Sequence, residues 1–272
     1  LGSGIGRYYE SITKELARNG FEIITAVPVK YKNVFLEDFK DIPLVKPIFV
    51  NYEKFSIKGY ILQSFLLRQL SKEINIFFFP HINLPFYVPK KTIVTIHDLI
   101  PFTKIWDRSI VKSFIYKYFL YRSIKKSRTL ICISETVKNE LITFNKSAQK
   151  KVQVIYEFPE EKFIRDKFFE EKSVIDKPYI LFVGNRKKHK NLRNLLLAFN
   201  ELKESLNHIL VIAGSKDSKI DEVDELISRL NLQDKVVQIV SPDDNTIRNL
   251  YKYADLFVFP SFIEGFGLPP LE

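Results

Sequence analysis

The sequence predicts an α/β protein in two halves, each with a parallel sheet and helices on both of its faces. Short β-branched or aromatic runs alternate with longer segments of helical periodicity along the 272 residues, as expected of buried parallel strands joined by helices. A stretch dense in charge, residues 157–178, interrupts this alternation before it starts again. We therefore expect two Rossmann-like domains, residues 1–157 and 179–272, joined by a linker over residues 158–178.

The first half begins with a predicted helix over residues 5–19, whose apolar residues recur at helical spacing and which ends at Gly20. Residues 30–56 show no clear pattern. Another helix is predicted over residues 57–72, and Ser134 is placed to cap the start of a further one. The strands of this half are predicted over residues 21–27, 74–79, 92–96, 129–133 and 152–156.

The second half shows the alternation more clearly. Its predicted strands cover residues 179–183, 208–213, 236–240 and 255–259, and its predicted helices cover residues 191–203, 220–230 and 246–253. The last residues, Pro269 to Glu272, are typical of the first turn of a further helix, because proline is tolerated at helix entry. Since the chain begins at Leu1, contains no methionine and stops at that turn, we expect a fragment shortened at both ends.

The composition is ordinary for a globular protein, with 46% apolar and 27% charged residues. The longest apolar runs are far shorter than the roughly 20 residues that cross a bilayer. Cys132 is the only cysteine, so no internal disulfide can form and the cytoplasm is the expected location.

The positive charge is concentrated in the first part of the chain. The net charge of +10 divides into +11 over residues 1–160 and −1 over residues 161–272. Nucleic acid, an anionic membrane surface or a phosphorylated acceptor would each explain this excess, and so would a solvated basic face. The segment from Lys104 to Arg128 carries eight basic residues and one acidic residue, but its apolar residues point to every side of a helix, so we expect a mostly buried helix.

Two motifs of the first half are candidates for binding. A glycine-rich turn over residues 2–6 leads into the first predicted helix, where glycines allow close backbone approach and free N–H groups attract an anion. His97 and Asp98 directly follow a predicted strand, and ligands of parallel α/β sheets bind beyond the carboxyl ends of strands. Asp98 as a helix cap and His97 as a hydrogen-bonded turn residue are the structural alternative.

The third motif joins a strand to a helix through a basic turn. Residues 186–190 have the sequence Arg-Lys-Lys-His-Lys and follow Gly184 at the end of the strand over residues 179–183. Cations beside the N–H groups of a helix start can bind a diphosphate, which favours a binding role over a solvated basic loop.

The fourth motif is the most informative. Glu264 and Glu272 flank a tight turn with two glycines and two prolines after the last predicted strand. Because the prolines lack N–H groups, the donors left around the turn belong to Gly267, Leu268, Leu271 and Glu272. A Glu272 ionised at a helix start is suited to accept hydrogen bonds from paired hydroxyls, such as those of a ribose, although a capping role would also explain this residue.

The stretch from Phe259 to Glu272 closely resembles the retaining glycosyltransferases of family 4, which have the GT-B fold of two Rossmann-like domains facing across a cleft, and in particular bacterial mannosyltransferase-like members. Residues 182–192, 97–101, 133–135 and 3–8 fit the same family in the same order. The resemblance therefore covers nearly the whole chain. The family usually begins with a strand before the glycine turn and continues past the second glutamate, which agrees with a shortened chain.

The resemblance implies a role for each motif. Lys190 would contact the donor diphosphate, Glu272 the ribose and Glu264 the sugar, and His97 would approach the transferred sugar from the other half. The resemblance thus makes His97, Lys190 and Glu264 the expected catalytic residues. Asn185 stands where many relatives have an arginine, and Arg186 or His189 are the candidates to replace it. The remaining donor-binding candidates are the phosphate neighbours Gly4 and Gly6, the backbone amides of Phe266, Gly267 and Leu268, and Ser241 and Pro242 near the base.

The predicted function is transfer of a hexose such as mannose, with retention, from a GDP- or UDP-linked donor to a glycan or lipid-linked acceptor in cell-surface polysaccharide synthesis. Four scattered histidines and one cysteine show no spacing suited to a metal, so we expect neither metal nor cofactor. Peripheral attachment to the inner face of the membrane extends this prediction. The alternatives are a non-catalytic remnant that binds nucleotide sugars and, more distantly, a basic nucleic-acid-binding protein, for which no recognition motif is present, so we expect no nucleic-acid partner.

Overall fold

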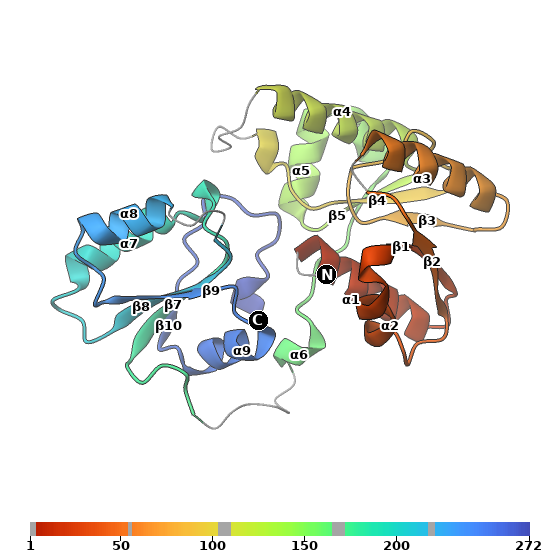
Figure 1. Ribbon diagram of the computed structural model, residues 1–272. Coiled ribbons are helices and arrows are strands. Elements are labelled where there is room, and N and C mark those ends of the chain that lie inside the picture. Colours follow the sequence, from red (N-terminus) through yellow and green to blue (C-terminus); the bar gives the residue numbers. More distant parts are fainter. Residues whose placement is uncertain (1–3, 54–55, 103–109, 165–171, 217–220) are drawn as a thin grey trace. The chain divides into compact units, whose positions relative to one another are not determined.

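The computed structural model describes residues 4–53, 56–102, 110–164, 172–216 and 221–272 (Figure 1). The chain divides into two compact units. Unit 1 comprises Leu1–Leu99 and Arg108–Glu157, and unit 2 comprises Ile100–Asp107 and Phe158–Glu272. Each unit is an α/β structure with parallel strands, as the sequence predicts.

Unit 1 contains a two-stranded pair, β1–β2, and a four-stranded sheet in the order β3-β4-β5-β6, all parallel. A small core of Ala17, Val27, Phe35, Phe39 and Val45 joins the strand pair to α1 and α2. The elements of this unit are β1 (Ile23–Pro28), β2 (Val45–Val50), β3 (Phe77–Phe79), β4 (Thr92–Ile96), β5 (Thr129–Cys132), β6 (Val152–Val154), α1 (Gly4–Arg18), α2 (Lys32–Asp38), α3 (Ile57–Leu70), α4 (Ile110–Lys126) and α5 (Glu135–Phe144).

Unit 2 has one parallel sheet in the order β10-β7-β8-β9. Side chains alternate across its strands: Phe182, Leu210 and Ile212 pack under α7 and α8, whereas Leu181 and Val211 pack under α9 on the opposite face (Figure 1). The elements are β7 (Tyr179–Val183), β8 (Ile209–Gly214), β9 (Val236–Val240), β10 (Leu256–Phe257), α6 (Glu161–Ile164), α7 (Leu192–Leu202), α8 (Glu222–Arg229) and α9 (Asp244–Tyr253).

Local capping signals are confirmed where they were predicted. The Ser134 side chain accepts a hydrogen bond from the Val137 amide at 3.2 Å and begins α5. Residues 30–56, which show no clear sequence pattern, contain the seven-residue α2 and the strand β2. Both were hard to predict, because α2 spans only two turns and β2 contains Pro47, which a strand tolerates where its partner lies on one side only.

The prediction that the helix around residues 110–126 is mostly buried was wrong. Leu120 and Ile124 of α4 are buried, but Val111, Phe114 and Tyr118 are each more than half exposed. The helix therefore covers the sheet with a narrow face and leaves a broad apolar face toward solvent. The residues of the predicted basic segment before Ile110 lie partly outside the described part of the chain.

Candidate active site

The loops at the carboxyl edge of the unit 2 sheet are joined into one surface by backbone hydrogen bonds. Because its four strands are parallel, their carboxyl ends lie along the same edge. The bonds run from the Gly184 amide to the Ala213 carbonyl at 2.9 Å, from the Ser241 amide to the Gly214 carbonyl at 3.1 Å, and from the Phe262 amide to the His189 carbonyl at 2.8 Å. The loops after β9, β8, β7 and β10 are thus linked in that order.

Two glycines allow the loops after β7 and β8 to approach closely. Gly184 and Gly214 have φ values of +156° and +146°, which L side chains rarely adopt. A Cβ atom on Gly214 would lie 2.0 Å from the Gly184 carbonyl oxygen, so only glycine fits there. Gly214 was not among the residues singled out from the sequence; a glycine at the end of a buried strand is the signal that could have found it.

The basic turn after β7 meets the loop after β10 at an ion pair. Lys190 Nζ lies 2.6 Å from Glu264 Oε1, and the two side chains are only 12% and 21% exposed. The same ammonium group lies 5.4 Å from the centre of the Phe259 ring. The neighbouring Asn191 has φ of +61° and donates to the Pro260 carbonyl at 3.0 Å, which holds the turn against this loop. Two of the predicted catalytic residues are therefore in direct contact.

Glu272 is connected to the same region by aromatic side chains. The Tyr251 hydroxyl donates to Glu272 Oε2 at 3.2 Å, and its ring packs edge-on against Phe257 at 5.4 Å. Phe257 in turn stacks on Phe259 at 6.1 Å, the ring that lies beside Lys190. Burial raises the pKa of Tyr251, and the nearby charge of Glu272 raises it further, so the tyrosine stays protonated and can donate.

The turn between the two glutamates differs in one respect from the prediction. Pro269–Leu271 forms a single 3-10 turn, in which the Leu271 and Glu272 amides both donate to the Leu268 carbonyl, at 2.8 and 3.2 Å. Two of the four donors that the sequence leaves around this turn, the Leu271 and Glu272 amides, are thus already hydrogen-bonded within it. Gly267 has φ of +94°, which gives the turn its sharp bend.

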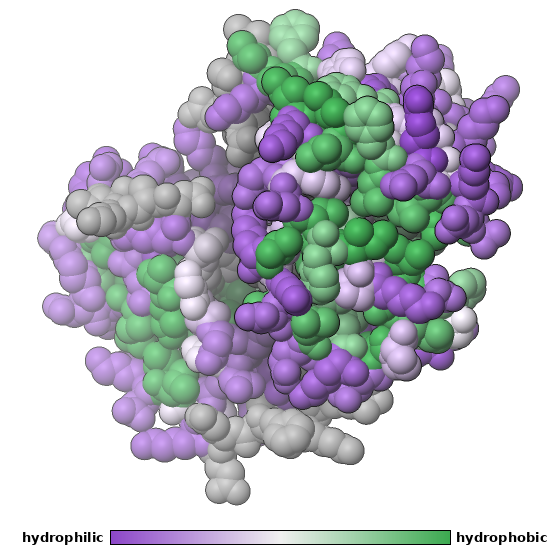
Figure 2. All heavy atoms as spheres, turned by 45° about the vertical axis from the view of Figure 1, so that its right-hand side comes forward, coloured by the Kyte–Doolittle hydropathy of each residue, from purple (hydrophilic) through white to green (hydrophobic). Residues whose placement is uncertain are grey.

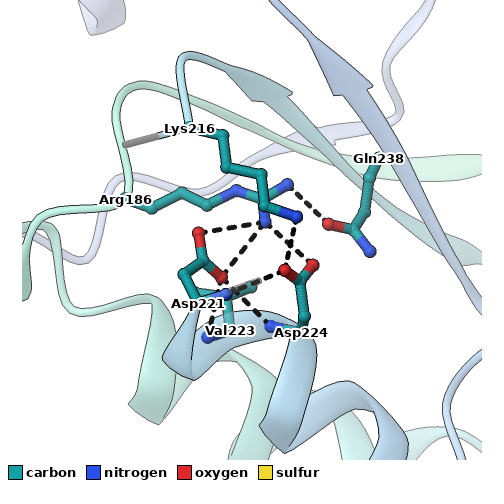
Figure 3. Close-up of polar contacts among 6 residues, drawn as sticks. All are labelled: Arg186, Lys216, Asp221, Val223, Asp224 and Gln238. Carbon is teal, nitrogen blue, oxygen red and sulfur yellow. Dashed lines mark hydrogen bonds and ion pairs between the residues drawn. The ribbon is translucent and has the colours of Figure 1, made fainter. Parts of the chain in front are cut away.

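Arg186 does not point toward an external anion. Its guanidinium lies 3.3 Å from Asp221 and 3.2 Å from Asp224 at the start of α8, it also bonds Gln238, and its side chain is only 4% exposed (Figure 3). Lys216 pairs with Asp224 in the same cluster. The charge of Arg186 is thus paired with two aspartates within unit 2, and its contact with the donor stays a prediction.

His189 does not supply a positive charge near neutral pH either. Burial lowers its pKa below the ordinary value of 6.5, and the charge of Lys190 lowers it further, with only a partial offset from Glu264. The imidazole is therefore neutral at pH 7 and can contribute hydrogen bonds only. Among the cations of residues 186–190, Lys190 is the one for which an ion pair with Glu264, in the loop after β10, is seen.

His97 lies in unit 1, directly after β4, and both of its ring nitrogens are engaged. Nε2 donates to the Pro80 carbonyl at 2.8 Å, since a carbonyl can only accept, and Nδ1 lies 3.0 Å from Glu157 Oε1. The Tyr8 ring packs edge-on against the imidazole at 4.8 Å, and its hydroxyl bonds Thr95 at 3.1 Å. His97 is therefore a hydrogen-bonded turn residue, and its contact with a sugar stays a prediction.

The remaining predicted residues lie at positions that leave their roles open. Gly4 and Gly6 fall in the first turn of α1, where a Cβ on Gly4 would meet open space. Ser241, with φ of +52°, and Pro242 directly follow β9 at the carboxyl edge of the unit 2 sheet. In the part of the chain that the structure describes, no group of three or more His, Cys, Asp or Glu residues is arranged to hold a metal ion.

Solved structures share this fold over nearly the whole chain. The glycosyltransferase WaaG of lipopolysaccharide biosynthesis matches with a TM-score of 0.66 at 16% identity, covering 99% of this chain and 74% of WaaG. Sucrose-phosphate synthase from Thermosynechococcus elongatus matches with a TM-score of 0.70 at 16% identity, covering 98% and 72% of the two chains. The fold is thus that of the GT-B glycosyltransferases.

Two family models meet close to the boundary that follows Glu157 between the two units. The model described as Glycosyltransferase Family 4 matches residues 2–158, and the model described as Glycosyl transferases group 1 matches residues 163–272. The chain therefore belongs to glycosyltransferase family 4, a family of retaining enzymes.

Curated relatives come from bacteria and an archaeon. The O-antigen chain mannosyltransferase RfbU of Salmonella typhimurium is 29% identical over 181 residues, which are 66% of this chain and 48% of RfbU. The uncharacterized glycosyltransferase MJ1607 of Methanocaldococcus jannaschii is 34% identical over 161 residues, 56% of this chain and 41% of that protein. The chain spans about half the length of the curated relatives it matches.

Proposed function

We propose that the protein transfers a hexose, with mannose as the first candidate, from a nucleotide diphosphate donor to a glycan or lipid-linked acceptor during synthesis of a cell-surface polysaccharide. The observation that carries the proposal is the Lys190–Glu264 contact of 2.6 Å at the carboxyl edge of the unit 2 sheet. Family membership supports the reaction type. The names of two relatives, RfbU and the O-antigen chain mannosyltransferase B of Escherichia coli, support mannose.

The chemistry follows from the charges at this edge. Transfer breaks the bond between the anomeric carbon and the phosphate oxygen, and the electron pair leaves with the diphosphate. Lys190 is held in a largely buried position, where a positive charge stabilises the developing negative charge more strongly than it would in water. Because the family is retaining, the acceptor oxygen is expected to bond the anomeric carbon on the same face, with its proton passing to the departing phosphate oxygen.

The two glutamates then bind the neutral parts of the donor. When a phosphate competes for Lys190, Glu264 is released to accept hydrogen bonds from sugar hydroxyls. Glu272 accepts hydrogen bonds from the paired hydroxyls of the ribose, and the Tyr251 hydroxyl fixes its orientation. The solved structure of Anabaena HepE, which has the same fold, was determined in complex with UDP and glucose. A nucleotide sugar is therefore a reasonable first ligand to test.

The test begins with a panel of GDP- and UDP-linked hexoses, screened by thermal shift and by product formation. Lys190→Ala or Glu272→Ala is expected to lower the transfer rate at least about tenfold, the usual cost of a lost charged contact to a transition state. Lys187→Ala is the matched control, because Lys187 is an exposed cation of the same turn. Unchanged turnover in the two site variants contradicts the assignment, and nucleotide binding without any transfer supports a non-catalytic remnant instead.

A further inference from the structure

Glu157 is an acidic residue of unit 1 that the fold holds largely away from water. Hydrophilic side chains project from much of the surface of this unit (Figure 2), and no helix among the described residues is both long enough and apolar enough to cross a bilayer. Lys30 and Glu53, which pair with each other at this surface, are 52% and 72% exposed. The side chain of Glu157 is only 10% exposed. A carboxyl group withdrawn from water in this way requires hydrogen-bond donors for its oxygens.

Three strand ends bring their groups together at His97. The strands β3, β4 and β6 belong to one parallel sheet, so their carboxyl ends lie at the same edge. His97 follows β4, Pro80 follows β3, and Glu157 lies in the segment after β6. The Ile155 amide donates to the Cys132 carbonyl at 3.0 Å, which holds that segment against the end of β5. From there Glu157 reaches across β5 to His97.

The contacts of His97 require a proton between its ring and Glu157. Nε2 lies 2.8 Å from the Pro80 carbonyl oxygen, which can only accept, so Nε2 carries a proton. Nδ1 lies 3.0 Å from Glu157 Oε1. An unprotonated Nδ1 beside an ionised carboxylate would set two acceptors against each other, so the pair shares one proton. Either both groups are charged, with opposite signs, or both are neutral.

The second carboxyl oxygen of Glu157 is an acceptor in both forms. If the shared proton is on Nδ1, the carboxylate is ionised and Oε2 can only accept. If the proton is on Oε1, Oε2 is the carbonyl oxygen of the acid and again accepts. In the part of the chain that the structure describes, Glu157 receives a hydrogen bond from His97 alone, and Oε2 is not fully enclosed. A ligand that reaches Oε2 must therefore bring a donor.

The surroundings of this oxygen favour a neutral ligand. The His97–Glu157 pair carries no net charge in either form, so it does not attract an ion. The ring of Tyr8 on α1 packs edge-on against the imidazole at 4.8 Å, and its hydroxyl bonds Thr95 at 3.1 Å. Burial raises the pKa of Tyr8, the hydrogen bond to Thr95 partly offsets this, and the charge of Glu157 raises it further, which shows that the carboxyl group lies near the phenol. An aromatic ring beside an acceptor oxygen suits a sugar, which has hydroxyl donors and apolar C–H groups.

We propose that Glu157 binds a hydroxyl of a sugar substrate through Oε2, and that His97 is the positioning residue that holds Glu157 for this contact. The resemblance gives the opposite order, in which His97 itself approaches the sugar. Both ring nitrogens of His97 are used within unit 1, so a sugar could bond the ring only by breaking one of these contacts. The inference rests on the proposed function and deepens it, because the hydroxyl belongs either to the transferred sugar or to the acceptor.

The experiment combines Glu157→Ala with sugars that lack one hydroxyl. GDP-mannose and its monodeoxy analogues are compared as donors, and methyl α-mannoside and its monodeoxy analogues as acceptors. Loss of the contacted hydroxyl should lower kcat/KM of the unchanged protein roughly ten- to a hundredfold, the range for a hydrogen bond to a carboxylate. In Glu157→Ala the same analogue should be used as well as the parent sugar, because the hydroxyl has no partner left. The series that responds identifies the substrate that Glu157 contacts.

Two further variants separate the roles of Glu157 and His97. Glu157→Gln should keep part of the preference for the hydroxyl, since its amide can donate to Nδ1 while its oxygen still accepts. His97→Ala should weaken the preference less than Glu157→Ala, because the carboxylate remains but is no longer held. Glu37→Ala is the matched control, because it removes a carboxylate of the same unit that is 72% exposed. It should keep the full preference, and circular dichroism verifies the folding of every variant.

The outcomes for this inference and for the proposed function can be told apart. Dissociation constants of the same sugars, measured by calorimetry, give the same comparison without turnover, so it can be made even if no hexose is transferred. Absence of transfer from every donor counts against the proposed function alone. The role of Glu157 is overturned if Glu157→Ala discriminates against the deoxy sugars as the unchanged protein does. It is equally overturned if His97→Ala loses the preference while Glu157→Ala keeps it.

Discussion

Replacing Gly214 with alanine tests how the carboxyl edge of the unit 2 sheet is assembled. The added Cβ would lie 2.0 Å from the Gly184 carbonyl oxygen and 2.6 Å from the Gly184 carbonyl carbon. Real contacts of this kind are not shorter than 3.0 Å, so one backbone segment must move by about 1 Å. Since both atoms are backbone atoms, no side-chain rotation can relieve the contact.

The expected loss of stability has two parts. Holding alanine at φ of +146° costs about 1–3 kcal/mol, and displacing packed backbone costs about 1–3 kcal/mol more. The free energy of unfolding of unit 2 should therefore fall by about 2–6 kcal/mol. Because Gly184 begins the turn that carries Lys190, the same displacement should also weaken the thermal stabilisation produced by a nucleotide.

Urea unfolding followed by circular dichroism measures the first effect, and thermal shift with GDP or UDP measures the second. Gly184→Ala is the control, because it has a similar φ of +156° but the nearest atoms to its Cβ belong to side chains, the Phe182 ring at 3.3 Å and Lys190 Cδ at 4.0 Å. It should cost about 1–3 kcal/mol from the backbone alone. If Gly214→Ala is no less stable than Gly184→Ala, the close contact between the two strand ends does not constrain the site.

Three further predictions concern protonation. Burial raises the pKa of Asp224, but hydrogen bonds from Lys216, the Asp221 amide and Arg186 outweigh this, so its pKa lies below the ordinary 3.8. The contribution of Asp224 to stability is therefore present above about pH 3.8 and is lost as the pH falls further. Acid unfolding should show a weaker pH dependence in Asp224→Asn. Because the fold keeps His189 neutral, with a pKa below 6.5, stability should fall as the pH drops below about 6.5, and His189→Gln should reduce that slope in urea titrations between about pH 7 and 5. Burial raises the pKa of Cys132 to about 12, so a thiol reagent at pH 8 should react with it only when unit 1 unfolds; rapid labelling of the native protein would contradict the buried position.

The alternation of strands and helices could be predicted from the sequence because it depends on neighbouring residues. The strands β4, β7 and β9 have the predicted bounds. β4 and β7 are largely buried, and such strands are continuous runs of apolar, mostly β-branched or aromatic residues. The helix cap at Ser134 is equally local. The short motifs around Lys190 and Glu264 likewise carried the resemblance to the family that the chain-wide match then confirmed. By contrast, the apolar residues within residues 30–56 repeat too few times, at either helical or strand spacing, to identify the helix α2 and the strand β2.

Which side chains meet was decided only by the tertiary structure. Lys190 and Glu264 are 74 residues apart and touch because β10 lies next to β7 in the sheet, a strand order that no local pattern specifies. The partners of Arg186 lie on α8 and β9, so a residue that is an exposed cation in the sequence pattern becomes a buried one. The local spacing of apolar residues thus determined most helices and strands of this protein. Which charges are available to a ligand depended instead on packing between distant segments, because the partners that the fold brings to a charged side chain set how strongly its charge is already paired.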